Sequence, residues 1–223
     1  MALAATLASW ATGAGAEAGF GLALASDDRF RGESTSDQRP VATASLSYDD
    51  VRGPYVGATL TLVATRRDGL QPLRSIQYIG YAQRVGSGIA LDLGVTHRAY
   101  SHYYAGGYAR DYAEFYVGAS GPRWSSHVYV APSYEGRKGS ATYGEISLLL
   151  LSRDSWSVTG HVGLLAPPGR GGPYSRDPVI DWRLGATRRL GGFGLSLDWV
   201  GASSGGYSRR GHSGLVLSAS RSF

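Results

Sequence analysis

Alternation of apolar and polar residues with a period of two runs through most of this chain. Phe20, Leu22 and Leu24 alternate with small residues, and the pattern recurs at 55–64, 89–96, 112–119, 156–164, 180–187, 193–199 and 214–219. Successive side chains of a β-strand point to opposite faces, so this period predicts strands with one apolar face. Weaker strand segments fill 40–48, 73–85, 124–134 and 141–151, and no helical period follows residue 18. The sequence therefore predicts an all-β protein of about twelve strands, each long enough to cross a bilayer at a tilt.

The connections between these segments alternate in length. Short ones fall at 49–54, 86–88, 120–122, 152–155 and 191–192, and longer ones at 28–38, 66–72, 97–109, 135–140, 166–178 and 203–211. Short periplasmic turns and longer extracellular loops, on an even number of strands, are typical of bacterial outer-membrane barrels. We therefore expect a single antiparallel transmembrane β-barrel over residues 19–223.

The face of the strands opposite the apolar face distinguishes a membrane barrel from a soluble β-sandwich. It is rich in Gly, Ala, Ser and Thr, and only 17% of the chain is charged, whereas soluble surfaces carry roughly a quarter or more charged residues. Aromatic residues near the strand ends suit the two membrane interfaces: Phe20, Tyr48, Trp124, Trp156, Trp182, Trp199 and Phe223. Three arginines, Arg84, Arg188 and Arg221, fall on the expected lipid face near strand ends, where their side chains can reach the headgroups.

Both ends of the chain carry features of an exported barrel. Residues 1–18 predict a signal peptide, because Ala2 to Thr12 are small and apolar and Ala16-Glu17-Ala18 fits a cleavage site. The last residue, Phe223, follows an alternating strand and matches the assembly signal of outer-membrane barrels. We therefore expect export through the periplasm to the bacterial outer membrane, with membrane lipid and the barrel-assembly machinery as partners.

The lumen face predicts the candidate site. Its charged members are Asp92, Arg98, Glu114, Glu145, Asp181, Arg183, Arg189 and Asp198, accompanied by His127 and His161. Acids and bases are mixed, which suits either a polar pore wall that selects small solutes or an ion-pair network that fills a narrow barrel. Our main hypothesis is a narrow passive channel for small hydrophilic solutes or ions. The first alternative is a non-conducting structural or adhesive barrel that acts through its outer loops.

Enzymatic, metal and nucleic-acid functions have less support. A lipid hydrolase needs Ser, His and an orienting group in contact, but His212 and Ser213 are strand neighbours that point to opposite faces. A barrel lipid hydrolase is therefore kept only as the second alternative, and we expect no enzyme activity and no catalytic residues. The chain has no cysteine, and His97 and His102 alone are a weak metal signal, so no metal or cofactor is expected. The net charge is only +5 and the arginines are scattered, which argues against nucleic acid.

One loop carries a family resemblance. Residues 30–40 read Phe-Arg-Gly-Glu-Ser-Thr-Ser-Asp-Gln-Arg-Pro, with Arg31, Gly32, Ser34, Ser36 and Pro40 as the motif positions. This block resembles one near the mature N-terminus of a proteobacterial TorF-like family of outer-membrane porins. The resemblance implies an outer-membrane barrel with a pore and supplies no substrate.

The role of Arg31 is open at this stage. Its side chain could fold inward and narrow the lumen, or it could pair with Asp27, Asp28 or Glu33 at the loop tip. We favour the loop-tip ion pair.

Overall fold

The structure is a computed structural model that describes residues 16–223, except residues 87, 105–110, 135–138, 167–176 and 204–212. Its strands are β1 (Glu17–Ala25), β2 (Arg29–Phe30), β3 (Glu33–Ser34), β4 (Val41–Asp49), β5 (Pro54–Thr65), β6 (Gly69–Val85), β7 (Ile89–Tyr100), β8 (Tyr112–Gly121), β9 (Trp124–Ala131), β10 (Ala141–Arg153), β11 (Trp156–Ala166), β12 (Val179–Leu190), β13 (Phe193–Ala202) and β14 (Ser213–Ser222). Within the described residues, no helix has the length and apolar character needed to cross a membrane. Residues 1–15, most of the predicted signal peptide, lie outside the described residues, and Glu17 and Ala18 belong to β1.

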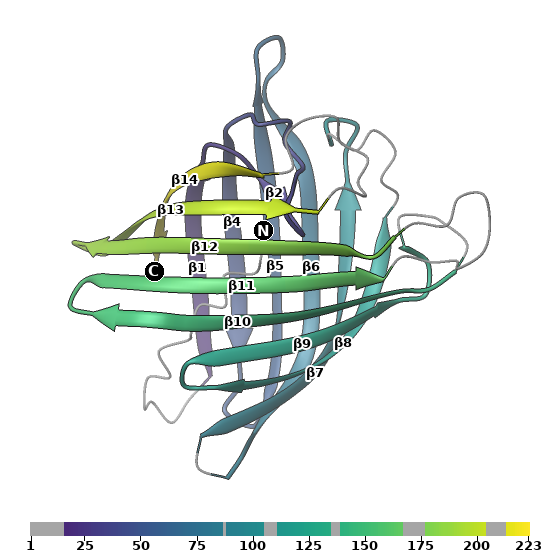
Figure 1. Cartoon of the computed structure of the whole chain (residues 1–223), viewed down its shortest axis with the longest axis vertical. Coiled ribbons are helices and arrows are strands. Elements are labelled where there is room, and N and C mark those ends of the chain that lie inside the picture. The colour runs from purple at the N-terminus through teal and green to yellow at the C-terminus, as the bar shows by residue number, and fades with distance from the viewer. Residues whose placement is uncertain (1–15, 87, 105–110, 135–138, 167–176, 204–212) are drawn as a thin grey trace.

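Twelve of these strands form one closed antiparallel barrel, which confirms the predicted fold. The order runs β1, then β14 back to β4, so each strand pairs with its neighbours along the chain. In Figure 1 the front strands β9–β13 cross the rear strands β1 and β4–β6 at a steep angle, as expected for tilted barrel strands. The seam closes between β1 and β14, where Phe20 and Phe223 exchange backbone hydrogen bonds of 2.8 and 3.3 Å. Their rings lie 5.7 Å apart.

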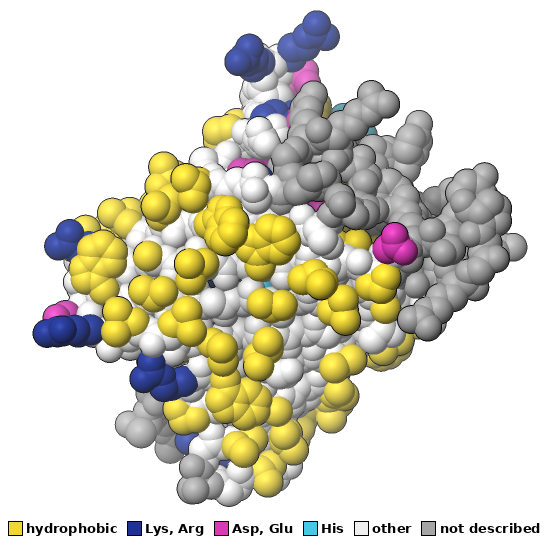
Figure 2. All heavy atoms as spheres, in the orientation of Figure 1, with side chains coloured by type: hydrophobic (Ala, Val, Ile, Leu, Met, Phe, Trp, Pro, Cys, Tyr) yellow, Lys and Arg dark blue, Asp and Glu magenta, His cyan; other side chains and the backbone are white. Residues whose placement is uncertain are grey.

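The outer surface is a belt of apolar side chains to which all twelve barrel strands contribute. Phe20, Leu22 and Leu24 of β1 are 39%, 46% and 63% exposed, and Leu195, Leu197 and Trp199 of β13 behave in the same way. Figure 2 shows apolar side chains spread over the barrel wall, with Arg side chains toward its ends. Soluble monomers rarely expose so large an apolar area. The belt is therefore the surface of a membrane-spanning barrel, and the predicted alternation is correct.

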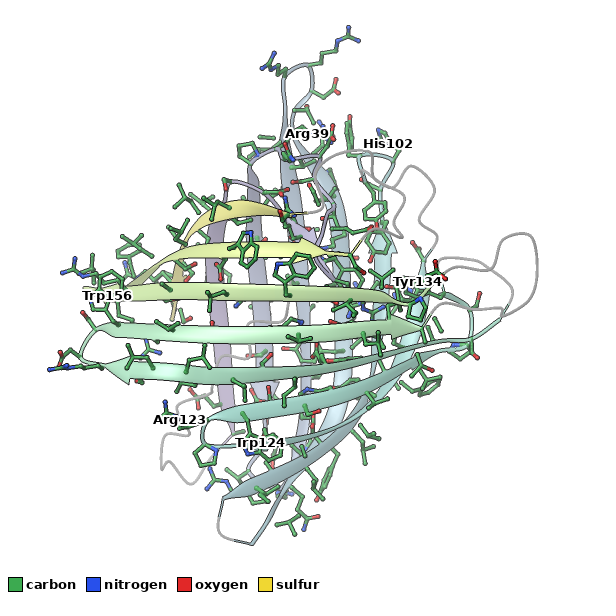
Figure 3. The ribbon with its side chains drawn as sticks, in the orientation of Figure 1. Arg39, His102, Arg123, Trp124, Tyr134 and Trp156 are labelled. Carbon is green, nitrogen blue, oxygen red and sulfur yellow. The ribbon has the colours of Figure 1, made fainter. Side chains whose placement is uncertain are left out.

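Aromatic and cationic side chains meet at the end of the barrel that carries the short turns, here called the short-turn end. The Arg188 guanidinium lies 5.4 Å from the centre of the Trp156 ring, and that of Arg221 lies 4.7 Å from the Phe223 ring. Figure 3 places Arg123, Trp124 and Trp156 at this end, and Arg39, His102 and Tyr134 toward the opposite, long-loop end. Arg188 and Arg221 therefore lie on the outer face near strand ends, as predicted.

Two predictions about β6 are wrong. Arg84 faces the lumen side, because Tyr81 and Val85 are exposed on the outside and Arg84 has the opposite parity. The alternation misleads here because β6 also carries apolar residues inward, such as buried Ile76. The expected long connection at 66–72 is instead a three-residue turn at 66–68 between the extended strands β5 and β6. Pro72 lies beside a register shift in the β5–β6 pairing, a position in a strand that tolerates proline.

The core of the protein lies inside the barrel at its long-loop end. Val41, Val63 and Leu73 form a buried apolar cluster there, and a second cluster contains Tyr112, Ala131, Tyr134 and Ala141. The lumen at this end is therefore filled by side chains. Much of the filling comes from the segment between β1 and β4.

Candidate functional site

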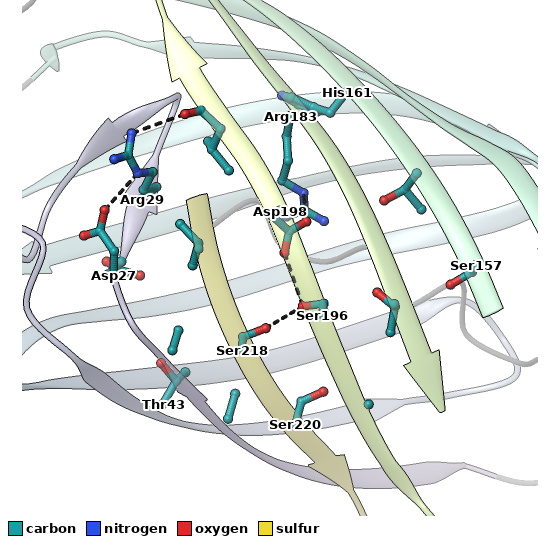
Figure 4. Close-up of a pocket in the computed structure, with 18 of the residues that line it drawn as sticks. Asp27, Arg29, Thr43, Ser157, His161, Arg183, Ser196, Asp198, Ser218 and Ser220 are labelled. Carbon is teal, nitrogen blue, oxygen red and sulfur yellow. Dashed lines mark hydrogen bonds and ion pairs between the residues drawn. The ribbon is translucent and has the colours of Figure 1, made fainter. Parts of the chain in front are cut away.

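The segment between β1 and β4 folds into the barrel as a small hairpin. β2 pairs with β3, with Arg29 opposite Ser34 and Phe30 opposite Glu33. The turn is Arg31-Gly32, and both residues have positive φ, 48° and 80°. Most of residues 27–36 are buried, with eight side chains at most 9% exposed. We call residues 27–39 the lumen hairpin. Figure 4 shows its Asp27 and Arg29 beside β13 and β14.

Arg31 does not make the loop-tip ion pair that the sequence favoured. Its Nη2 donates to Glu114 Oε1 on β8 at 2.7 Å, and Arg98 Nε on β7 donates to Glu114 Oε2 at 3.1 Å. All three side chains are at most 7% exposed. The nearby acids have other partners: Asp27 pairs with Arg29 and Asp28 pairs with Arg74 on β6, each at 2.8 Å. The prediction is wrong because the hairpin turns inward and aims Arg31 at the opposite wall.

Aromatic rings surround this buried charge cluster. The Arg31 guanidinium lies 3.9 Å from the centre of the Tyr143 ring and 4.7 Å from that of Phe30. The Arg98 guanidinium lies 4.6 Å from the centre of the Phe30 ring. Cation–π contacts of this kind compensate part of the cost of burying a cation. Two guanidiniums share one carboxylate, so the Arg31–Glu114–Arg98 cluster carries a net positive charge.

Two hairpin charges, Arg31 and Asp28, remain ionised. Burial alone would lower the pKa of Arg31, but the Glu114 carboxylate raises it well above its ordinary value. Burial alone would raise the pKa of Asp28, but Arg74 and the hydrogen bond from Thr35 hold it below the ordinary aspartate value. Both groups therefore act as charged anchors at neutral pH.

The remaining motif residues shape the hairpin. Asp27 Oδ1 accepts hydrogen bonds from Ser34 at 2.6 Å and from Ser36 at 2.9 Å. The Pro40 carbonyl accepts from the Ala64 amide at 2.9 Å. A Cβ added to Gly32 would lie 2.3 Å from the Gly201 carbonyl oxygen on β13. Gly32 is therefore required both by its backbone conformation and by its contact with the wall.

Between the lumen hairpin and the short-turn end lies a cavity of about 690 Å³. Residues 27–32 of the hairpin form its roof. Hydroxyl groups line much of its wall (Figure 4): Thr43, Ser157, Thr159, Thr187, Ser196, Ser218 and Ser220. Residues of the turns at 152–155 and Gly192 line its far end. The cavity is therefore a vestibule of mixed polar and apolar lining that extends from the hairpin toward the short-turn end.

The eight predicted pore-lining residues all lie on the inner side of the strands. Six line the vestibule: Arg98, Glu145, Asp181, Arg183, Arg189 and Asp198. Arg183 Nε donates to Asp198 Oδ1 at 3.1 Å. Asp92 accepts from Tyr55 at 3.2 Å, and Glu114 belongs to the buried cluster described above. The structure thus brings most of these charges into pairs, and their role in a pore stays a prediction.

Sequence reasoning missed a wall of inward tyrosines on β5–β10. Five tyrosines lie there, several with their hydroxyl ends against glycines of other strands: Tyr55, Tyr78, Tyr116, Tyr129 and Tyr143. A Cβ at Gly57 would lie 2.2 Å from the Tyr78 hydroxyl, and one at Gly163 would lie 2.1 Å from the Tyr143 hydroxyl. The sequence signal was present, since glycine on one strand faces tyrosine on the next. The lumen therefore has an aromatic half on β5–β10 and a hydroxyl-rich half on β11–β14, β1 and β4.

A Ser–His–Asp arrangement also crosses three strands. Ser147 Oγ lies 3.0 Å from His161 Nδ1, and His161 Nε2 lies 3.1 Å from Asp181 Oδ1. The sequence search missed it because the residues come from β10, β11 and β12. Ser147 pairs with both neighbouring strands, and the three side chains form a hydrogen-bonded element of the lumen wall.

Comparisons with known proteins agree with this architecture. A family model described as "Bacterial protein of unknown function (Gcw_chp)" matches residues 11–215. A search of curated proteins finds no match. Among solved structures, "KdgM porin" and "KdgM porin in complex with disordered oligogalacturonate" each align with a TM-score of 0.57 at 10% identity, covering 92% of this chain and 99% of the other. At this identity the likeness shows the fold alone.

Proposed function

Since this chain belongs to the Gcw_chp family of bacterial proteins of unknown function, we propose from its structure that it is an outer-membrane porin. The observation that carries the proposal is the vestibule of about 690 Å³ inside a closed barrel with an apolar outer belt. Hydroxyl groups both donate and accept hydrogen bonds, so the wall of β11–β14 can replace the water around a hydrophilic solute. The function is passage of small hydrophilic solutes or ions through this lumen.

The location follows from the same features. Strands that span a bilayer as a closed barrel satisfy every backbone group without water, and bacterial barrels of this kind face the periplasm with their short turns. The lumen hairpin then enters from the outside, and the vestibule faces the periplasm. The signal peptide at residues 1–18 and the assembly role of Phe223 belong to this proposal, as does the TorF-like resemblance of the hairpin motif.

The charges of the vestibule favour small polar solutes over a single ion type. Arg183 and Asp198 face each other in the wall, and Arg189 lies near the short-turn end. One KdgM porin with this fold has an oligogalacturonate bound, which supports hydrophilic oligosaccharides as one class of solute to test. The function proposed is transport, and it assigns no catalytic role to Ser147, His161 and Asp181.

Planar-bilayer recording tests the proposal. The full chain is compared with a variant in which residues 29–37 are replaced by a short Gly-Ser linker, and folding of both is verified by circular dichroism. We expect discrete conductance steps, at least in the variant with the hairpin removed. Silence of both folded proteins would refute the porin function and leave the non-conducting barrel.

A further inference from the structure

The lumen hairpin reaches across the barrel to strands on several sides. Arg31 pairs with Glu114 on β8, and Asp28 pairs with Arg74 on β6. Arg29 donates to the Val200 carbonyl on β13 at 3.4 Å, and its guanidinium packs against Gly214 on β14. Because the hairpin contacts β6, β8, β13 and β14, it lies across the lumen and not along one side of the wall.

Arg39 Nη2 of the hairpin also donates to the Tyr103 carbonyl at 3.1 Å, but the two ion pairs to the wall leave guanidinium donors unused. The ion pairs to β8 and β6 each use one guanidinium nitrogen, Nη2 of Arg31 and Nη2 of Arg74. The other two nitrogens of each group, Nε and Nη1, are buried without a hydrogen-bond partner among the described residues. Buried donors without partners favour a state in which water reaches them. The docked position is therefore held by anchors that hydration can replace.

The hairpin also keeps its own structure when those anchors break. Asp27 bonds to Arg29, Ser34 and Ser36, all within the hairpin. Both flanks are attached to the barrel: the Ser26 amide donates to the Leu217 carbonyl at 2.9 Å, and the Pro40 carbonyl accepts from Ala64. The hairpin can therefore leave the lumen as a unit that turns about residues 26 and 40.

On these grounds we propose that the lumen hairpin is the gate of the channel. This inference rests on the proposed porin function. In the docked state the hairpin closes the lumen above the vestibule. In the undocked state it swings toward the long-loop end, and solute passes between the outside and the vestibule. Breaking its contact with the wall must therefore raise the fraction of time that the channel is open.

Two glycine substitutions separate undocking from backbone strain. Gly32 has a φ of +80°, and a Cβ there would lie 2.3 Å from the Gly201 oxygen and 2.8 Å from Ala202 Cβ. Gly69, the first residue of β6, has a φ of +70° with nothing within 4 Å of such a Cβ. Alanine imposes the same backbone strain at both sites, but only Gly32→Ala collides with the wall. We expect Gly32→Ala to raise the open-to-closed ratio by about tenfold or more, as overpacking against backbone would, and Gly69→Ala to match the wild type.

Single-channel recording of four proteins gives the answer: wild type, Gly32→Ala, Gly69→Ala and the linker variant that lacks residues 29–37. The gate predicts a mostly closed wild type and a linker variant that stays open. A wild type that conducts as fully and steadily as the linker variant would overturn the gate and leave the porin function standing. Equal opening by the two alanine variants would also overturn it. Silence of both the folded wild type and the folded linker variant would refute the porin function itself. A wild type that conducts while the folded linker variant is silent would overturn the gate.

Discussion

Replacing Glu114 by glutamine tests the energetics of the docked hairpin. Glu114 forms ion pairs with Arg31 and Arg98 at 2.7 and 3.1 Å, and its side chain is 2% exposed. Removing one partner of a buried ion pair costs about 3–5 kcal/mol. Undocking hydrates Arg31 and relieves its share of this cost, whereas Arg98 stays in the wall in both states. We therefore assign about half of the cost, roughly 2 kcal/mol, to the docking equilibrium. Since about 1.4 kcal/mol is a factor of ten, the undocked population of Glu114→Gln should rise roughly 30-fold.

Limited trypsin digestion measures that population. Arg31 is buried in the docked state, so cleavage after it requires opening, and its rate follows the open population when opening is fast. Mass spectrometry of the fragments gives the rate at this site. Asp198→Asn is the matched control, because it removes another lumen carboxylate whose partners are Arg183 and Ser196. Unchanged cleavage in Glu114→Gln, or an equal rise in Asp198→Asn, would refute the argument.

Three further predictions concern pH, packing and selectivity. In the docked hairpin the pKa of Asp28 is below its ordinary value of about 3.9. The ionised Asp28 therefore stabilises the docked state fully above about pH 4, and this stabilisation is lost as the pH falls through the pKa of Asp28 in the docked state. The open probability in bilayers should stay constant from about pH 7 to 5 and rise below about pH 4. Gly163→Ala places a Cβ 2.1 Å from the Tyr143 hydroxyl, whereas the Cβ of Gly144→Ala meets nothing within 4 Å. The first substitution should lower the free energy of unfolding by about 1–3 kcal/mol, and the second should leave it unchanged. The heat-induced shift in electrophoretic mobility measures this difference. Asp198→Asn leaves its arginine partner unpaired in the vestibule wall, so the reversal potential in a salt gradient should move toward anion selectivity, and an unmoved potential would remove this pair from the conduction path.

The barrel wall could be predicted because its cause is local. A period of two places Leu91 and Leu93 outside and Asp92 inside wherever the strand lies in the barrel. The number of strands, the side to which each side chain points and the charged residues of the lumen therefore follow from the sequence. The prediction failed where both faces are apolar, as in β6, and where Pro72 suggested a loop although a register shift accommodates it.

The position of the lumen hairpin could not be predicted in this way. Arg31 and Glu114 lie 83 residues apart, and three acids lie within a few residues of Arg31. Local spacing therefore favours a loop-tip pair, whereas the closed barrel supplies the actual partner. The Ser147–His161–Asp181 arrangement was missed for the same reason, since only the register of β10, β11 and β12 brings the three residues together.

The attachment of the lumen hairpin to β1 has a consequence for how the protein assembles. β1 is the strand that must meet β14 to complete the barrel, and the contact of Arg29 with Val200 spans 171 residues. Contacts of such large sequence separation form slowly, because long loops must close first. The seam and the hairpin contacts on β13 and β14 both need β1 to arrive beside the last strands. Closure of the wall and occupation of the lumen are therefore coupled late steps of folding, and a chain that closes without the hairpin inside would have to admit it through the long-loop end.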